Sequence, residues 1–268
     1  MAAWIGGFAP IPLYLVHINC DISLMHQTTD CPTCPLRAKP AFVPIADDQI
    51  DVIRRFKSGE SSVARGDIVF NQGYAADHLF TVLDGYALRY RVLPDGRRQV
   101  LNFVFPGDFL GLQAGVMGKM KHSVQATTPM RLCRFERDRF FDFVSGSVSQ
   151  SFEVIWLAAT EEAFLGEVLT TVGQRTAAER VAWALVKIIR RSTALELGDG
   201  YAVPMPFRQQ DLADALGLSL VHTNKTLARF RERQIVNWAD RRLAVGNMAE
   251  LERIAQTSSE PEEPRPLI

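Results

Sequence analysis

The sequence predicts an α+β protein with an N-terminal antiparallel β-roll, a long central helix and a C-terminal winged helix-turn-helix. Three observations predict this order. Short apolar runs broken by glycines occupy about residues 62–143, and a continuous helical stripe of apolar residues follows from about residue 149. A short helix, a glycine corner and a second helix with a capping serine then occupy residues 208–230.

Composition is typical of a globular protein. Of the 268 residues, 47% are hydrophobic and 22% are charged, which gives enough apolar surface for about two packed domains. The 30 basic and 30 acidic residues balance, so any basic surface must be local. The apolar N-terminal stretch contains Pro10 and Pro12, begins without positive charges and is too short to cross a bilayer. We therefore expect a cytoplasmic protein with no membrane partner.

Changes in the sequence pattern divide the chain into five parts. The glycines and alternating strands end before the long helix, and a Pro- and Glu-rich segment with little to bury ends the sequence. We expect a loose N-terminal extension over residues 1–44, a β-roll sensor domain over 45–148, a dimerisation helix over 149–173, a winged helix-turn-helix over 174–256 and a disordered tail over 257–268.

The β-roll is predicted from short strand-like runs separated by glycines. A short amphipathic helix over about Asp47–Lys57 precedes runs such as DIVFNQG, HLFTVLDG and RLCRFE, which read as antiparallel strands. The sharpest signal is RYRVLPDGRRQVLNF. Here Asp95-Gly96 supplies the positive backbone angles of a tight hairpin between two alternating runs.

The long helix is predicted from an apolar stripe between residues 149 and 173. Side chains such as Ile155, Trp156 and Phe164 lie near one another at helical spacing, and the stripe is wide enough to need a partner. A second helix begins after Thr176, because Thr176 and Glu179 have the spacing of a capping box.

The helix-turn-helix is the most informative segment. Leu212, Ala213 and Leu216 form the inner face of its first helix, Gly217 permits the sharp turn, and Ser219 caps the second helix. The runs QIVNW and RRLAVG read as two strands of a wing joined by Ala239-Asp240.

The second helix has a polar and cationic outer face that fits the major groove of DNA. Residues 219–242 contain six Lys and Arg against two Asp and Glu, so the neutral chain has a local basic patch that can attract phosphates. A solvated face used for protein contacts is the alternative interpretation. The candidate DNA-contacting residues are Gln209, Ser219, Leu220, Val221, His222, Asn224, Lys225, Arg229 and Arg241.

The order of these parts resembles the Crp/Fnr family of bacterial transcription regulators over about residues 45–255. The motifs that carry the resemblance are GDIVFNQG, LPDGRRQVLNFVFPGDFLG and QQDLADALGLSLVHTNKTLARF. The resemblance implies a jelly-roll, cyclic-nucleotide-binding-like roll and a homodimer through the helix around residues 150–172. It further implies double-stranded DNA as a partner, with RNA polymerase as another candidate.

The resemblance also bears on the recognition of bases and effectors. The family's base-reading positions fall on Leu220, Val221 and Lys225. Cyclic-nucleotide binders of the family use a Glu and an Arg after the GDF segment, but Leu112 and Gln113 stand where the acid is expected and no Arg precedes Ser123. Cyclic AMP is therefore not the expected effector. Lys119, Lys121 and His122 could meet an anion, but they are better interpreted as exposed loop charges.

The cysteines are candidates for a cofactor site. Cys31 and Cys34 are separated by two residues, a spacing that can hold zinc or one edge of an iron–sulfur cluster. Oxygen-sensing members of the family bind a cluster through an N-terminal cysteine segment and a later strand cysteine. The resemblance therefore implies Cys20, Cys31, Cys34 and Cys133 as ligands, although Cys20 is farther from Cys31 than such members require.

Other uses of the cysteines stay open. Cys31 and Cys34 could alternate between a dithiol and a disulfide, and His17 and His26 could add zinc ligands. The presence of no cofactor is more strongly favoured than any single cofactor, because a free cysteine such as Cys133 is usually a small buried apolar residue.

An enzyme is the alternative from another functional class. A metal-dependent, cupin-like enzyme would use the β-roll pocket, but His78 and His122 are the only histidines in the roll and no nucleophile or phosphate-binding motif accompanies them. We therefore expect no catalytic residues. The aromatic side chains expected in the roll core rather than in a haem pocket are Phe80, Tyr86, Tyr90 and Phe105.

Overall fold

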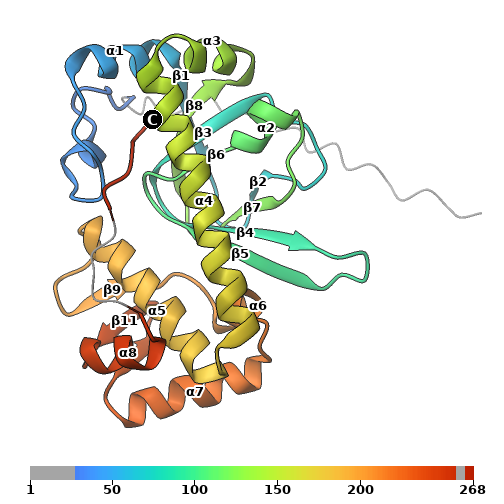
Figure 1. Cartoon of the computed structure of the whole chain (residues 1–268), viewed down its shortest axis with the longest axis vertical. Coiled ribbons are helices and arrows are strands. Elements are labelled where there is room, and N and C mark those ends of the chain that lie inside the picture. Colours follow the sequence, from blue (N-terminus) through green and yellow to red (C-terminus); the bar gives the residue numbers. More distant parts are fainter. Residues whose placement is uncertain (1–27, 258–262) are drawn as a thin grey trace, which may run out of the picture.

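The computed structural model describes residues 28–257 and 263–268. A β-roll lies beside the upper part of one long helix, and a smaller domain of helices and a wing lies around its lower end (Figure 1). The α+β class and the predicted order of roll, long helix and winged helix-turn-helix are confirmed. None of the helices in the described part of the chain combines the length and apolar character that crossing a bilayer requires.

The β-roll consists of two four-stranded antiparallel sheets, as the alternating runs predict. Their orders are β1-β8-β3-β6 and β2-β7-β4-β5. Apolar side chains between the sheets, such as Val82, Val124 and Leu132, are fully buried, and each stabilises the fold by about 1.5–3 kcal/mol. The strands are β1 (Lys57–Val63), β2 (Ile68–Phe70), β3 (His78–Asp84), β4 (Ala87–Val92), β5 (Arg98–Val104), β6 (Phe109–Leu110), β7 (Ser123–Ala126) and β8 (Met130–Glu136).

Short helices close one end of the roll. The rings of Phe56 and Phe143 stack with centroids 4.4 Å apart, and Phe56 also stacks on Phe135 at 4.7 Å, so the helices are fixed to the sheet by aromatic contacts. These helical elements are η1 (Pro35–Ala38), α1 (Asp47–Phe56), α2 (Leu112–Met117), η2 (Arg137–Arg139) and α3 (Phe140–Ser145).

The hairpin between β4 and β5 is confirmed, but its turn differs from the prediction. Gly96 has a φ of 85°, whereas Asp95 is not among the residues with positive φ. The amide of Gly96 donates to the carbonyl of Leu93 at 2.9 Å, and the amide of Leu93 donates to the carbonyl of Arg97, also at 2.9 Å. These bonds make a type I turn followed by a left-handed glycine, which requires only one residue with positive φ.

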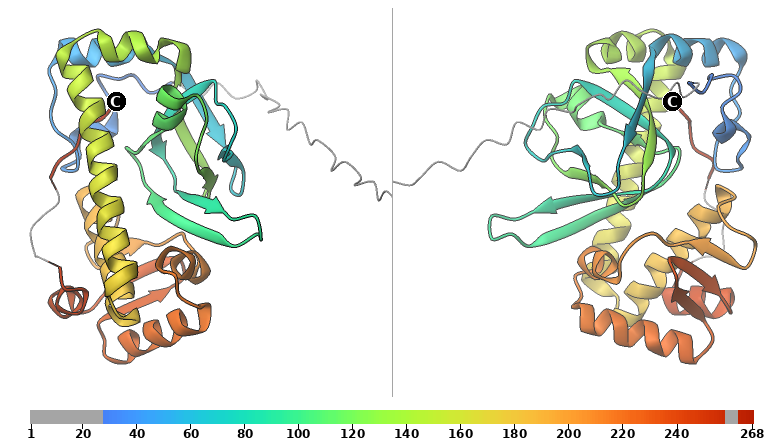
Figure 2. Two further views of the ribbon diagram at one scale, coloured as in Figure 1. Left: turned by 45° about the vertical axis from the view of Figure 1, so that its right-hand side comes forward. Right: turned by 180° about the vertical axis from the view of Figure 1, so that it is seen from behind.

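The long helix α4 (Val148–Gln174) begins at Ser147, whose hydroxyl accepts a hydrogen bond from the amide of Gln150 at 3.3 Å. One side of α4 packs on the roll and on the lower domain, and the other side, called the free side below, faces away from the other described elements (Figure 2). The free side carries large apolar residues, because Phe152 and Ile155 are each 63% exposed and Leu169 is 75% exposed.

The lower domain contains the predicted helix-turn-helix and wing. The carboxylate of Glu179 accepts from the amide of Thr176 at 2.8 Å, as the predicted capping box requires.

The wing turn is shifted by one residue from the prediction, because Asp240 and Arg241, rather than Ala239 and Asp240, have positive φ. The elements are α5 (Ala177–Ala194), β9 (Ala202–Pro204), α6 (Gln209–Leu216), α7 (Leu220–Glu232), β10 (Val236–Ala239), β11 (Arg242–Val245) and α8 (Met248–Ala255), and the three strands pair in the order β10-β11-β9.

The prediction of two unpacked ends is wrong for the described residues. Leu36 and Phe42 of the N-terminal segment are buried, and so are Leu267 and Ile268 at the end of the chain. Phe42 forms a parallel β-bridge with Arg265, so the two segments stabilise each other. Apolar residues of both segments pack against the roll. Such contacts between distant parts of the chain cannot be predicted from local composition.

Candidate nucleic-acid interface

The outer face of α7 is open to solvent. His222, Asn224, Lys225 and Arg229 are exposed, and Val221 at the start of the helix is 78% exposed. An exposed helix with cations, an amide and an imidazole can enter the major groove and donate to phosphates and base edges. The predicted face is therefore present and is not covered by described residues.

The inner face of α7 is buried and consists of two apolar residues and two threonines. Leu227 and Phe230 are buried, as predicted. Thr223 and Thr226 are also buried, and their hydroxyls donate to the carbonyls of Ser219 and His222 at 3.1 and 3.0 Å. Because both hydroxyls find a backbone partner one turn back, the threonines cost little by being buried.

The corner between α6 and α7 has the predicted geometry. Gly217 has a φ of 62°, a left-handed conformation that glycine adopts without strain. The hydroxyl of Ser219 accepts from the amide of His222 at 3.2 Å, so this predicted DNA contact already serves as a helix cap. Gln209 begins α6 and is half-buried, and Leu220 is 38% exposed.

Five of the six cations of this region show two kinds of surroundings. Lys225, Arg229 and Arg241 are exposed and form no ion pair within the part of the chain that the structure describes. In contrast, Arg233 pairs with Glu250 and Arg242 pairs with Asp199. The first group is therefore better suited than the second to meet phosphates.

A second set of charges, which sequence reasoning missed, joins α6 to the roll. Arg98 at the start of β5 lies 2.6 Å from a carboxylate oxygen of Asp211 and 2.7 Å from one of Asp214. Burial opposes ionisation of Asp211, but hydrogen bonds from Arg208 and Arg98 outweigh it and hold the pKa of this carboxyl below its usual value. No local pattern links Arg98 to residues more than a hundred positions away.

Aromatic rings extend the same junction. Phe207, just before α6, packs against Phe103, Tyr86 and Phe105, with centroid distances of 4.6, 6.0 and 6.1 Å. Two of the aromatics expected in the roll core, Tyr86 and Phe105, therefore contact the lower domain as well. Burial, followed by the charge of Asp84, raises the pKa of Tyr86 to about 12.

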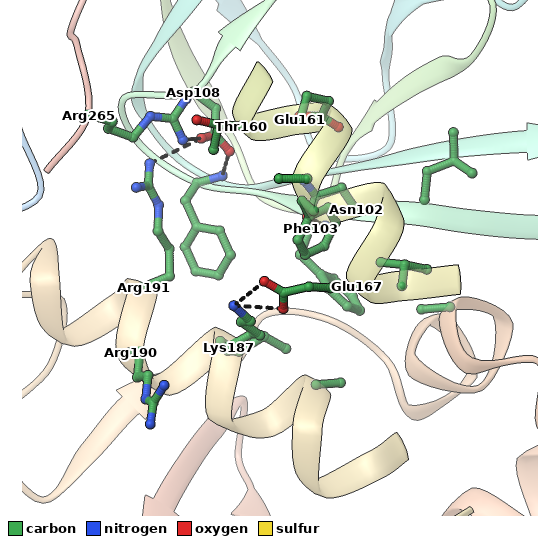
Figure 3. A pocket seen from close by; sticks show the side chains of 18 of the residues that line it. Asn102, Phe103, Asp108, Thr160, Glu161, Glu167, Lys187, Arg190, Arg191 and Arg265 are labelled. Carbon is green, nitrogen blue, oxygen red and sulfur yellow. Dashed lines mark hydrogen bonds and ion pairs between the residues drawn. The ribbon is translucent and has the colours of Figure 1, made fainter. Parts of the chain in front are cut away.

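A cavity of about 460 Å³ lies between β5, α4 and α5 (Figure 3). Asp108 accepts from Arg191 and Arg265 on one side, and Glu167 pairs with Lys187 at 3.0 Å on another. These five charged side chains of the lining are thus engaged with one another.

Comparison with known proteins agrees with this architecture. Residues 60–147 match the family of cyclic nucleotide-binding domains, and residues 179–254 match the family of Crp-like helix-turn-helix domains. The chain is 30% identical to the transcriptional activatory protein AadR of Rhodopseudomonas palustris over 63% of this chain and 70% of that one. It is 31% identical to the nitrogen fixation regulation protein FixK of Rhizobium meliloti over 71% of this chain and 81% of the relative.

The chain belongs to the Crp/Fnr family of transcription regulators. The FixK2 structure from Bradyrhizobium japonicum has the same fold, with a TM-score of 0.67 and 23% identity over 75% of this chain and 98% of that chain. The DNA-binding helix-turn-helix and the cyclic-nucleotide-binding-like roll of this Crp/Fnr regulator are thereby confirmed. The enzyme alternative finds no support among these relatives, which are transcription regulators.

Charged groups pair where the roll of this Crp/Fnr regulator meets the long helix. Arg89 of β4 lies 2.8 Å from Glu161 of α4 and donates to the carbonyl of Phe109 at 3.0 Å. His122 is buried, so its interpretation as an exposed loop charge is wrong. Burial, with help from Arg89 and Arg91, lowers the pKa of His122 to about 4, and a neutral imidazole is a poor anion ligand. Lys119 and Lys121 are exposed as expected.

The cysteines come together only in part. Cys31, Cys34 and Cys133 line one small pocket of the roll, while Cys20, His17 and His26 lie outside the described residues. Burial raises the pKa of Cys31 and raises that of Cys133 to about 12, which opposes formation of the thiolates that metals bind.

The donor set of this pocket does not fit a metal group in the described arrangement. Among residues 28–257 and 263–268, no three His, Cys, Asp or Glu side chains are placed to hold an ion. His78 and His122 thus belong to no such group of three ligands among these residues. The cluster and zinc assignments stay predictions only because they also involve Cys20, His17 and His26, which lie outside the described residues.

Proposed function

We propose that this Crp/Fnr regulator binds a near-palindromic DNA site as a homodimer, with α7 of each copy in a major groove. The open outer face of α7 carries this proposal, because Asn224, Lys225 and Arg229 are exposed while the opposite face is packed. We assign phosphate contacts to Arg229 and Arg241 and base contacts to His222, Asn224 and Lys225. Because the chain as a whole has no net charge, its attraction to DNA has to come from this local basic face.

The free side of α4 supports the dimer. Val148, Ile155, Glu162 and Leu169 recur at intervals of seven residues, and all four are exposed. A second exposed row, beginning at Phe152, continues with Ala159, Gly166 and Gly173. Two rows spaced by three and four residues are the pattern of a coiled-coil seam, and small residues in one row let two helices approach closely.

DNA binding can be tested with fluorescence anisotropy on genomic fragments enriched by the protein. We expect nanomolar binding that weakens steeply with salt, because phosphate contacts release counterions. Lys225→Ala should weaken specific binding by about tenfold, since a lost base contact costs roughly 1–3 kcal/mol. The matched control is Lys119→Ala, which removes an exposed cation from the roll. Weak binding that is equal for all fragments and for both variants would contradict the proposal.

The dimer seam can be tested independently of DNA. Ile155→Asp places a charge in the proposed helix–helix contact and should shift the protein from dimer to monomer in analytical ultracentrifugation. Val116→Asp is the matched control, because Val116 is 70% exposed on α2, away from the seam. A wild-type protein that sediments as a monomer at micromolar concentration would contradict the dimer.

We further propose that the signal that controls DNA binding is redox state rather than cyclic AMP, because of the cysteine pocket. Three cysteines from the N-terminal segment and β8 line one pocket. Iron, sulfide and zinc analysis after anaerobic purification would distinguish a cluster, a zinc site and a thiol switch. We expect DNA affinity to differ between oxidised and reduced protein. If oxidised and reduced protein bind DNA with equal affinity and no metal is bound, the cysteines do not act as a sensor. Contact with RNA polymerase stays a prediction.

A further inference from the structure

The last residues of the chain return from the lower domain to the roll (Figures 1 and 2). The amide of Arg265 donates to the carbonyl of Ala41 at 3.0 Å, and the amide of Val43 donates to the carbonyl of Arg265 at 3.0 Å. These two hydrogen bonds flank Phe42 and form the parallel β-bridge. The final segment is thus added as a short strand to the N-terminal segment.

The side chain of Arg265 engages a buried carboxylate. It lies 2.7 Å from Asp108, which also accepts from Arg191 of α5 at 3.1 Å and from the amide of Phe105 at 2.8 Å (Figure 3). Burial opposes ionisation of Asp108, but the charges of Arg265, Arg191 and Arg89 prevail and hold its pKa below the usual value. One carboxylate of the roll therefore holds both the end of the chain and a helix of the lower domain.

The apolar residues that follow are seated in the cysteine pocket. Leu267 and Ile268 are each 4% exposed and line the pocket together with Cys31 and Cys133. The hydroxyl of Thr81 in β3 donates to the backbone carbonyl of Ile268. The segment thus combines a charged contact, backbone hydrogen bonds and two apolar anchors, which together define a specific binding mode.

We propose that residues Arg265–Ile268 are an intramolecular strap that fixes the DNA-binding domain against the roll in the arrangement that exposes α7. The strap pairs with Ala41, whose amide donates to the carbonyl of Ala194 at the end of α5 at 3.0 Å, and Arg265 shares Asp108 with Arg191 of α5, so the attached strap limits how far α5 can move. Because the strap also covers the cysteine pocket, its release would open the pocket and loosen the DNA-binding domain in one event. The effect on DNA affinity rests on the proposed function.

The strap can be tested with a chain that ends at Glu263 and with Leu267→Asp in the full chain. Pro264→Ala is the matched control, because Pro264 is exposed next to the strap. The first readout is alkylation by iodoacetamide at each cysteine, followed by mass spectrometry. We expect Cys133 to react at least tenfold faster in both strap variants than in the wild type or the control. The second readout is amide exchange over α6, which should become faster as the domain loosens.

Rescue in trans separates strap loss from general misfolding. A synthetic peptide of residues 263–268, added at millimolar concentration to the truncated chain, should slow Cys133 alkylation again, because attachment to the chain provides an effective concentration of about that size. Unchanged Cys133 alkylation in both strap variants would overturn the strap, and so would faster alkylation without faster α6 exchange. Leu267→Asp keeps the test valid if the truncated chain is insoluble.

DNA binding supplies the last readout. We expect both strap variants to bind the enriched fragment about fivefold more weakly than Pro264→Ala, since only part of their population keeps the binding arrangement. Equal or tighter binding by the strap variants would overturn the proposal. If the wild type binds no DNA, the proposed function fails, and the cysteine and amide-exchange results alone decide whether the strap exists.

Discussion

Basic side chains have opposite surroundings in two regions of this regulator. On α7, Lys225 and Arg229 face solvent without an ion pair to any described residue. At the junction of the roll and the DNA-binding domain, Arg98 and Arg191 are largely buried and held by carboxylates. Unpaired exposed cations can meet phosphates, whereas the paired buried ones fix geometry, because removing one partner would leave a desolvated charge. Sequence alone shows the charges but not this division of roles.

The largest effect is expected at Asp108. Asp108→Asn removes the negative charge that Arg191 and Arg265 share and should lower the free energy of unfolding by about 4 kcal/mol, as measured by urea denaturation. Asp142→Asn, which changes an exposed carboxylate in α3, should be neutral. A similar small effect for both substitutions would mean that the junction is not stabilised by its charges.

A somewhat smaller effect should follow from the buried histidine. His122 has a pKa of about 4 in the folded chain and about 6.5 when unfolded, so the unfolded state binds more protons between these values. Stability should therefore fall by roughly 3 kcal/mol as the pH drops from 7 to 4. In His122→Asn this part of the decline should vanish, while His78→Asn, at the half-exposed histidine, should decline like the wild type. Parallel curves for all three proteins would contradict the role of His122.

The smallest change in stability is expected on α7. Arg229→Ala should alter the free energy of unfolding by no more than about 0.5 kcal/mol, because the side chain is exposed and unpaired within the described chain. Its effect should instead be on DNA, where the slope of log affinity against log salt should decrease by about one. Loss of stability without a change in that slope would place Arg229 in the structural group of cations.

The parts of the fold that the sequence predicts well are set by local chemistry. Gly217 and Ser219 define the corner of the helix-turn-helix within three residues, and the Thr176–Glu179 cap starts α5. The hairpin at Gly96 is also local. Its turn type was predicted wrongly because Asp-Gly fits both a type I′ turn and a type I turn with a left-handed glycine, and Pro94 favours the second.

The parts that could not be predicted depend on contacts between distant segments. The Pro- and Glu-rich tail has the composition of a disordered segment, yet its last residues find a bridge at Phe42, a carboxylate at Asp108 and a pocket for Leu267. Arg98 meets Asp211 only because β5 and α6 are brought together by the fold. Of the candidate site, residue types and helix faces could be predicted, but their pairing and burial could not.

The length of α4 has a mechanical consequence. Twenty-seven residues make a rod of about 40 Å that touches the roll near one end and the reading unit near the other. If the rod pivots at its upper end by five degrees, its lower tip travels roughly 3–4 Å, which is close to the rise of one base pair. Glu161, which Arg89 of the roll holds, lies about halfway along this rod, so a shift of roughly 1–2 Å beside Glu161 becomes a displacement of about one base-pair rise at the lower tip.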